Sequence, residues 1–188
     1  MTTILQKIEF GNPVLRKEAK ELSHDEILSE GAQLLIVNMR HTLIEKKYGI
    51  GLAAPQVGHN ISLSVIEIRP TEIRPNLPKS EWRSLNIINP KILKLYGGKK
   101  EYWEGCISLP DVFAKVPRYK KVHVRYTDEK GAIHEEEFEG LLAHALQHEV
   151  DHLNGKLFVD KVKNSSTYMT AAEYKKRIVK KEGLGQYD

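Results

Sequence analysis

The chain has 188 residues, of which 40% are hydrophobic and 29% charged, and this composition excludes both an intrinsically disordered chain and a protein with many membrane spans. Its 29 basic and 25 acidic residues give a formal net charge of +4, too small an excess to predict a nucleic-acid partner, so we expect no DNA binding. A chain of this length is expected to form one domain, residues 1–188, with a substantial core.

Two further features bear on the cellular compartment. A single cysteine cannot form a disulfide within the chain, which favours a reducing environment. The first residues lack the pattern of a signal peptide, and no run approaches the ~20 apolar residues that span a bilayer. We therefore expect a cytoplasmic protein with no membrane partner, and the absence of an Arg- and Ser-rich leader favours a bacterial source.

The first predicted element is a helix, and strands follow it. Ser23 and Glu26 have the spacing of a capping box, and apolar residues recur on one helical face from there until Gly49, so one long helix is predicted. Strand patterns follow at 61–68, 85–88 and 91–96, with a turn at Gly97 and Gly98. A hairpin is predicted between 122 and 138, around a turn at 128–131.

Helical spacing returns near the C-terminus. It runs from Leu141 to Leu153 and stops at Asn154-Gly155, a typical helix end. A second helix is predicted over 168–181, within a basic C-terminal segment that begins at about 166. Strands in the middle of the chain with helices on either side indicate a single α+β domain.

The most informative motif lies in the helix that ends at Leu153, and it reads Gln147-His148-Glu149-Val150-Asp151-His152. Residues four apart lie on one face of a helix, so His148 and His152 can bind one metal ion. Glu149 then lies beside the metal and can act as general base on a water molecule. The alternative is a solvated helix end with two unrelated histidines.

A hydrolytic metal centre needs a third protein ligand and an open position. Three residues beyond Gly155, where some metallopeptidases place a histidine, this chain has Phe158. Glu173 lies about 20 residues downstream, the distance of a thermolysin-like ligand, but its basic neighbours indicate a solvated helix.

Cys106 is the remaining candidate for the third ligand. It lies in Glu104-Gly-Cys-Ile-Ser-Leu-Pro110, where the glycine and the proline indicate an irregular segment rather than a core strand. Its alternative role is that of a small buried apolar residue. One thiolate with two imidazoles would accept Zn²⁺, Fe²⁺, Co²⁺ or Ni²⁺.

A third unusual stretch is rich in small residues and reads Gly49-Ile-Gly-Leu-Ala-Ala-Pro-Gln56. Small residues allow a substrate backbone to approach closely, and the side-chain amide of Gln56 is an uncharged hydrogen-bond donor. Taken alone, the stretch is better explained by a helix stop and a tight turn into the next strand, because glycines are common at such positions.

Taken together and in this order, GIGLAAPQ, EGCIS and QHEVDH resemble the three motifs of the peptide deformylase family, over about residues 12–162. That resemblance implies a metal-dependent hydrolase that removes the N-formyl group from N-formylmethionyl nascent peptides in protein biosynthesis. It also implies a fold of antiparallel β-sheets around a central metal-binding helix, with N-terminal and C-terminal helices.

The resemblance further implies the roles of individual residues. Cys106, His148 and His152 would bind one divalent metal ion, natively Fe²⁺, and Glu149 would be the general acid and base. Gln56 and the backbone N–H of Ile107 would form the oxyanion site. Gly51 and Gly105 match positions whose backbones pair with the extended peptide.

The resemblance also assigns surrounding positions. Helical spacing puts Leu141, His144 and Ala145 on one face, where they can line a pocket with Ile50, and the family uses such a pocket for the methionine side chain; His144 can instead support a metal ligand from behind. The family usually pairs the equivalent of Glu104 with that of Arg118. Phe113 stands where many members have arginine, and the proline-containing loop over 69–83 has no assigned function.

Two rival functions stay open at this point. One is a peptidase that uses the same helix motif with a different third ligand. The other is a catalytically inactive, deformylase-like protein that binds the ribosome. Residues 161–188 contain seven basic and three acidic residues, so the net charge of this segment is +4, the same as that of the whole chain. We therefore expect a weak contact between this segment and the anionic ribosome surface.

Overall fold

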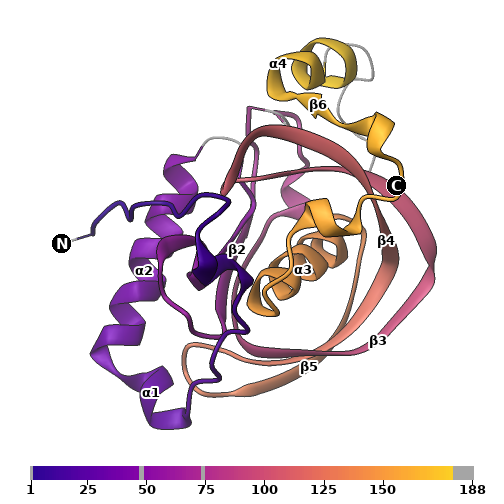
Figure 1. The fold of residues 1–188 in the computed structure, drawn as a ribbon. Helices are drawn as coiled ribbons and strands as arrows, with labels where there is room; N and C mark the ends of the chain where they lie inside the picture. Colours follow the sequence, from indigo (N-terminus) through magenta and orange to yellow (C-terminus); the bar gives the residue numbers. More distant parts are fainter. Residues whose placement is uncertain (1, 47–48, 73–74, 180–188) are drawn as a thin grey trace.

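The computed structural model describes residues 2–46, 49–72 and 75–179, and Figure 1 gives the arrangement of the elements. The helices and strands follow one another as α1 (His24–Leu28), α2 (Glu30–Glu45), β1 (Gly51–Ala53), β2 (Leu63–Ile68), β3 (Arg83–Cys106), β4 (Leu109–Thr127), β5 (Ile133–Glu139), α3 (Gly140–Leu153), β6 (Met169–Thr170) and α4 (Ala171–Tyr174). A π-helical turn, Lys175–Val179, continues α4. None of the helices in the described ranges is long and apolar enough to cross a membrane.

The strands form one connected antiparallel sheet in the order β1-β2-β3-β4-β5, and β6 pairs with β4. β3 and β4 make a long hairpin that curves around α3, so that this helix lies in the concave side of the sheet (Figure 1). The predicted α+β class and the antiparallel sheet around the helix with the two histidines are therefore confirmed. The predicted hairpin is also present, with β4 and β5 joined by the turn that follows Asp128.

The predicted long N-terminal helix is in fact two helices, and Ser29 is the reason. Its backbone is extended, with φ −61° and ψ 146°, and its hydroxyl accepts the N–H of Ala32, so it caps a new helix. The capping box at Ser23 and Glu26 is present at the start of α1. The serine hydroxyl offers the backbone a local alternative to helical bonding, and here it interrupts the apolar repeat.

The turn predicted at Gly97 and Gly98 is wrong. The strand continues through both glycines to Cys106, and the register of the β3–β4 pair shifts between Tyr96 and Lys99. Both glycines have positive φ, 78° and 73°, so they form an irregularity that bends the strand rather than one that ends it. The same continuity places Cys106 at the end of a strand, not in the irregular segment that was expected.

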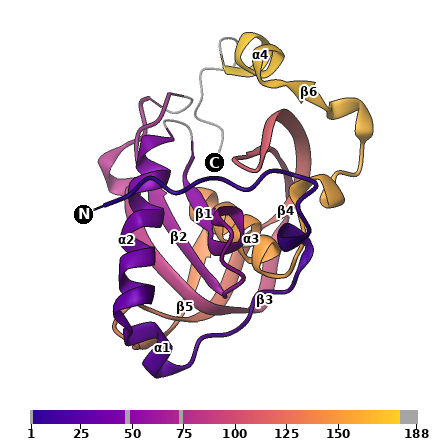
Figure 2. The ribbon, with the colours of Figure 1, turned by 60° about the vertical axis from the view of Figure 1, so that its left-hand side comes forward.

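The C-terminal helix starts later than predicted. Met169 and Thr170 pair with Phe113 and Val112 of β4, and the helical residues begin only at Ala171. In Figure 2 this segment rises beside the upper part of β4, away from α1 and α2. The last residues of the predicted 168–181 helix, 180 and 181, lie outside the described residues.

Apolar clusters pack both the N-terminal helix α2 and helix α3 against the sheet. One joins α2 to β1 and β2 and contains Met39, Leu43, Leu52 and Leu63, all fully buried. The other fills the space between the sheet and the apolar side of α3, and Leu146 is fully buried in it. Because this side of α3 is held by the sheet, the histidines on its remaining surface are directed toward the end of β3.

Candidate metal centre

Three ligand atoms converge where the end of β3 meets the C-terminal half of α3. The Sγ of Cys106 lies 3.2 Å from Nε2 of His152, which lies 3.2 Å from Nε2 of His148. Over the described part of the chain this is the only group of three or more His, Cys, Asp or Glu residues in which the ligand atoms all lie within 4.8 Å of one another. One thiolate and two imidazole nitrogens suit a borderline-soft divalent cation, so this donor set fits a bound metal.

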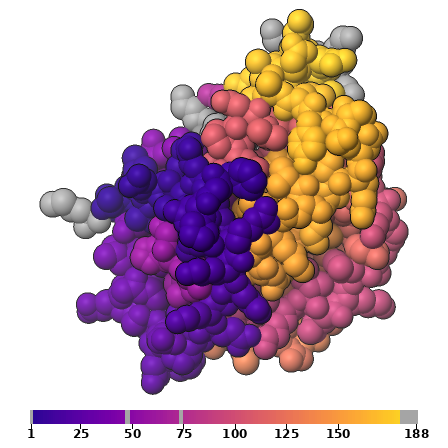
Figure 3. Space-filling model, in the orientation of Figure 1, coloured from indigo at the N-terminus to yellow at the C-terminus, as the bar shows by residue number. Residues whose placement is uncertain are grey.

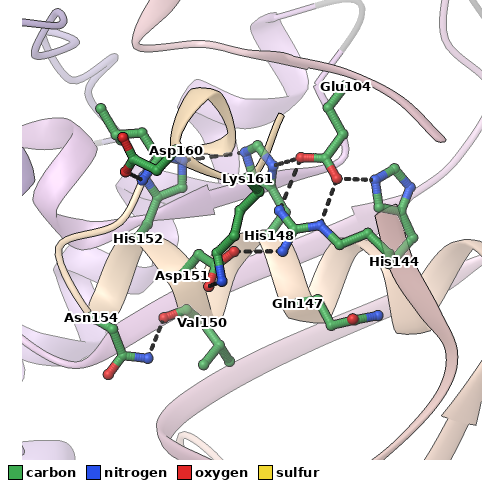
Figure 4. Close-up of polar contacts among 12 residues, drawn as sticks. Glu104, His144, Gln147, His148, Val150, Asp151, His152, Asn154, Asp160 and Lys161 are labelled. Atoms are coloured by element: carbon green, nitrogen blue, oxygen red, sulfur yellow. Dashed lines mark hydrogen bonds and ion pairs between the residues drawn. The ribbon is translucent and has the colours of Figure 1, made fainter. Parts of the chain in front are cut away.

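Glu104 orients the metal ligands from behind. Its Oε2 accepts the Nδ1 hydrogen of His148 at 2.8 Å, which leaves Nε2 of His148 as the nitrogen that faces Cys106 and His152. Its Oε1 accepts from Nε2 of His144 at 2.9 Å, and Arg118 donates to both oxygens at 2.7 and 3.0 Å. In Figure 4 the Glu104 carboxylate lies between the rings of His148 and His144.

Charge complementarity keeps Glu104 ionised. Burial alone would raise its pKa, but Arg118 and His144 outweigh that effect and hold the pKa of Glu104 well below its usual range. Burial lowers the pKa of His144, and the neighbouring Glu104 only partly offsets that effect. Arg118 is itself tied at the other side, because its Nη1 donates to Asp151 at 2.5 Å.

Glu149 is a buried carboxylate beside the ligand atoms. It lies on α3 next to His148, is 4% exposed, and its Oε2 has no hydrogen-bond partner among the described residues. Burial raises the pKa of Glu149 to about 7, which is suited to a group that accepts and returns a proton near neutral pH.

Gly51 makes room for that carboxylate. A Cβ built on Gly51 would lie 2.2 Å from Oε1 and 2.9 Å from Cγ of Glu149. No real side chain tolerates such distances, so the glycine in the first motif and the glutamate in the third are mutually dependent. We expected only a role in substrate pairing for Gly51, and the structure adds this steric role.

Gln56 points its amide nitrogen at the metal ligands. Its Oε1 accepts the N–H of Ala53 at 2.7 Å, which fixes the orientation of the amide. Its Nε2 lies 3.3 Å from Sγ of Cys106 and 3.4 Å from Oγ of Ser108. A donor is therefore held beside the sulfur, where it can also meet an oxygen that reacts there.

A cavity of about 240 Å³ opens onto this centre. Its lining includes eleven of the residues predicted from the sequence, namely Ile50, Gly51, Gln56, Glu104, Gly105, Cys106, Ile107, His144, Ala145, His148 and Glu149. His144 serves in both of the ways considered for it, since it lines the cavity and also donates to Glu104.

One residue predicted to line the pocket lies elsewhere. Leu141 is buried in the apolar cluster between α3 and the sheet and does not line the cavity, because it faces the sheet two helical turns before the ligands. His152 and Arg118 are also outside the lining: His152 belongs to the ligand group, and Arg118 pairs with Glu104 as the resemblance implies. Glu173, the other possible third ligand, is not part of the ligand group.

Several contributors were not foreseen from the sequence. Asp151 holds Arg118, and Lys161 lies 3.3 Å from the other oxygen of Asp151 (Figure 4). Tyr102 stacks on His144 with ring centroids 4.7 Å apart. The position of Asp151 inside the histidine motif was a signal that could have been used, whereas Tyr102 is apparent only once β3 is seen to run on to Cys106.

Comparison with known proteins decides the family. The family model described as Polypeptide deformylase matches residues 4–168. The chain belongs to the polypeptide deformylase family. This assignment confirms the resemblance inferred from the three motifs and makes the protein a metal-dependent deformylase-type hydrolase.

Relatives in the family share most of the chain. A peptide deformylase of Bartonella tribocorum is 39% identical over 175 residues, which cover 93% of each chain. Peptide deformylase 2 of a Nostoc species is 35% identical over 179 residues, or 94% of this chain and 96% of the relative.

Solved structures of the family have the same fold. A class I type b peptide deformylase from Acinetobacter baumannii with bound Met-Ala-Ser superposes with a TM-score of 0.81 at 34% identity, over 86% of this chain and all of that chain. A peptide deformylase from Synechococcus elongatus in complex with actinonin gives a TM-score of 0.75 at 41% identity, over 87% of this chain and 81% of that chain.

Proposed function

We propose that the protein removes the N-formyl group from the N-terminal formylmethionine of newly made polypeptides and releases formate. The observation that supports this most directly is the convergence of Cys106, His148 and His152 beside the buried carboxylate of Glu149, at the inner end of one cavity. Three protein ligands with a cavity in front of them leave room for a reacting group, as a hydrolytic site requires.

The proposed metal would supply Lewis-acid chemistry, since a bound divalent ion lowers the pKa of water and polarises a carbonyl oxygen. Glu149 accepts a proton from the attacking water and passes it to the amine nitrogen as the bond from nitrogen to the formyl carbon breaks. One carboxylate therefore serves as base and then as acid, and the products are formate and a free N-terminal amine. Gln56 Nε2 and the Ile107 N–H donate to the oxygen that becomes negative in the transition state.

The same residues fit an extended peptide. In the described sheet β1 pairs only with β2, and the 99–106 part of β3 pairs only with β4, so each has one edge without a strand partner. Gly51 and Gly105 lie on these two segments and both line the cavity. A peptide strand can pair with such edges through its main chain. Ile50 and Ala145, with His144, then line the pocket for the methionine side chain.

We further propose Fe²⁺ as the native ion, with Zn²⁺, Ni²⁺ and Co²⁺ as substitutes that the same donor set accepts. Glu104 and Arg118 support the site by holding His148 in one tautomer and orientation. Metal analysis of protein purified without oxygen tests the ion, and one equivalent of iron per chain is the expected result. Zinc at one equivalent with no iron would contradict the choice of Fe²⁺.

The remaining expectations concern the setting of the enzyme. We propose that residues 1–188 form one catalytic domain that acts in the bacterial cytoplasm. Lys175, Lys176 and Arg177 are exposed on the C-terminal segment, which supports a weak contact with the ribosome surface. Such a contact would weaken steeply with salt, and co-sedimentation with ribosomes at two salt concentrations tests it.

The decisive experiment measures formate released from formyl-Met-Ala-Ser, with peptide-bond cleavage of Met-Ala-Ser measured in parallel. We expect formate and no cleavage with the wild type, and we expect Glu149→Ala to retain its metal and lose turnover. Cleavage of the unformylated peptide would favour the peptidase. No turnover of either substrate by a metal-loaded protein would favour the inactive ribosome-binding protein.

A further inference from the structure

The C-terminal segment forms part of the wall of the active-site cavity. Ala171 and Tyr174 of α4 line the cavity, as does Lys175 directly after it, although all three lie well beyond the histidine motif, which ends at His152. In Figure 3 the yellow C-terminal segment lies directly against the salmon-coloured part of the β3–β4 hairpin. The three family motifs contribute none of these residues.

The wall is built from aromatic rings that reach back to the metal ligand. The Tyr174 ring stacks on Phe113 at 4.2 Å between centroids with 5° between the planes, and meets the edge of Trp103 at 5.8 Å. The Phe113 ring in turn lies against the backbone of Gly105, where an added Cβ would come within 2.6 Å of it. Gly105 directly precedes Cys106, so this stack begins one residue from the metal centre.

Two attachments hold the segment in place. The pairing of β6 with β4 at Phe113 and Val112 fixes the residues just before Tyr174. On the far side, Nζ of Lys175 lies 3.9 Å from Oε2 of Glu72, in the proline-containing loop that had no assigned role. Tyr174 itself is only 3% exposed, so its ring is rigidly packed and supports from behind the more exposed ring of Phe113, which faces the cavity.

The direction of the substrate brings its second residue to this wall. The formyl group must lie at the ligand atoms, and the first side chain enters the buried pocket of Ile50 and Ala145. The rest of the polypeptide must leave through the open side of the cavity, where Pro110, Asp111 and Lys175 are exposed. Phe113 and Tyr174 also line the cavity, two residues from Asp111 and one residue from Lys175, so they lie close to that exit.

We propose that Tyr174, with Phe113, forms a subsite for the second residue of the nascent chain and favours a large apolar side chain there. This inference rests on the proposed deformylase function and adds a preference to it. Arginine at position 113 would present a charge to the same place, whereas Phe113 stacked on Tyr174 presents apolar rings, which attract apolar surface.

The test compares kcat/KM for formate release from formyl-Met-Phe-Ser and formyl-Met-Gly-Ser. We expect the wild type to favour the first peptide by about tenfold, because a phenylalanine side chain buries tens of Å² of apolar surface on the wall. Tyr174→Ala should remove most of that preference through KM, with the rate on formyl-Met-Gly-Ser little changed, and Tyr174→Phe should keep the preference. Tyr168→Ala is a matched control, since Tyr168 is an exposed tyrosine on the same segment outside the cavity.

An equal loss of kcat/KM on both peptides in Tyr174→Ala would overturn the proposed subsite. The same loss of peptide preference in Tyr168→Ala would also overturn it.

A second readout does not depend on turnover. The chain has two tryptophans, so Trp82→Phe leaves Trp103 as a single fluorescent probe at the edge of the Tyr174 ring.

In a titration followed by Trp103 fluorescence, unformylated Met-Phe-Ser should bind to Trp82→Phe about tenfold more tightly than Met-Gly-Ser. In the double variant Trp82→Phe/Tyr174→Ala the two dissociation constants should be equal. Equal binding of the two peptides before that change would overturn the inference. Formate from none of the peptides would refute the proposed function, and the Trp103 titration would still decide the subsite.

Discussion

At the scale of single residues, the site depends on contacts between motifs that lie far apart in the chain. Gly51 and Glu149 are separated by almost a hundred residues, yet the carboxylate lies where a Cβ of residue 51 would be. Glu104 likewise joins β3 to α3 by accepting hydrogen bonds from His144 and His148. Both residues can be tested by small changes.

Gly51→Ala should lower kcat by about 100-fold, because displacement of a catalytic group by about 1 Å has effects of that size. The substituted Cβ must push away Glu149, whose Oε1 lies 2.2 Å from the built position. The measurement is formate release, with thermal unfolding to confirm the fold. Gly31→Ala is the control, since a Cβ at Gly31 on α2 meets nothing within 4 Å. Equal kcat in the two variants would show that catalysis does not require the Glu149 carboxylate to stay in this position.

Glu104→Gln should weaken metal binding by about 10- to 100-fold, as is typical when a carboxylate behind a ligating histidine is lost. The amide can still accept one hydrogen bond from His148, but it no longer balances the buried Arg118. Competition for Zn²⁺ with a chromophoric chelator measures the affinity directly. Glu135→Gln is the control, because Glu135 pairs with Arg125 at an exposed position. A wild-type affinity in Glu104→Gln would mean that His148 is oriented by other contacts.

At the scale of elements, local signals predicted most of what the structure contains. The capping box at Ser23, the helix from about Leu141 to Leu153 and the hairpin around 128–131 follow from nearest-neighbour patterns, and each is present. The ligand set was also accessible, because two histidines four apart and a lone cysteine are compositional signals.

The errors at this scale share a physical cause. Gly97 and Gly98 resemble a turn, but the pairing of β3 with β4 on both sides of them keeps the strand continuous. Tyr174 gave no signal as a cavity residue, since its position depends on β6 joining β4. In both cases the pairing of strands that are distant in the sequence determined the structure, and this pairing cannot be inferred from a single sequence.

Ser29→Ala should lower the free energy of unfolding by about 1 kcal/mol, the usual effect of losing an N-cap. The Ser29 hydroxyl accepts from Ala32 N–H and donates to the Glu26 carbonyl, so it both starts α2 and ends α1. Urea unfolding measures the change, and Ser29→Thr, which keeps the hydroxyl, should recover most of it. An unchanged unfolding midpoint in Ser29→Ala would indicate that α1 and α2 can merge into the single helix that the apolar repeat predicts.

At the scale of the whole molecule, the metal centre adds a further link between the β3–β4 hairpin and α3, which are already joined by apolar packing and by hydrogen bonds such as those of Glu104. Cys106 ends the long β3 strand, and His148 and His152 come from α3, so a bound ion links the curved hairpin to the helix inside it. The three ligand atoms come together only when the hairpin and the helix are folded, so an ion binds the folded chain in preference to the unfolded one. Binding to the folded state alone must therefore stabilise that state.

Removal of the metal with a chelator should lower the thermal midpoint by about 5–10 °C. An ion at 100 times its dissociation constant contributes about 2.7 kcal/mol, and in a chain of this size each kcal/mol shifts the midpoint by about 2–4 °C. His152→Ala removes one buried ligand, so its midpoint should be low and should no longer respond to the chelator. Calorimetry with and without added Zn²⁺ measures both effects. A wild-type midpoint that stays constant while metal analysis records loss of the ion would show that the ion contributes nothing to holding the hairpin and α3 together.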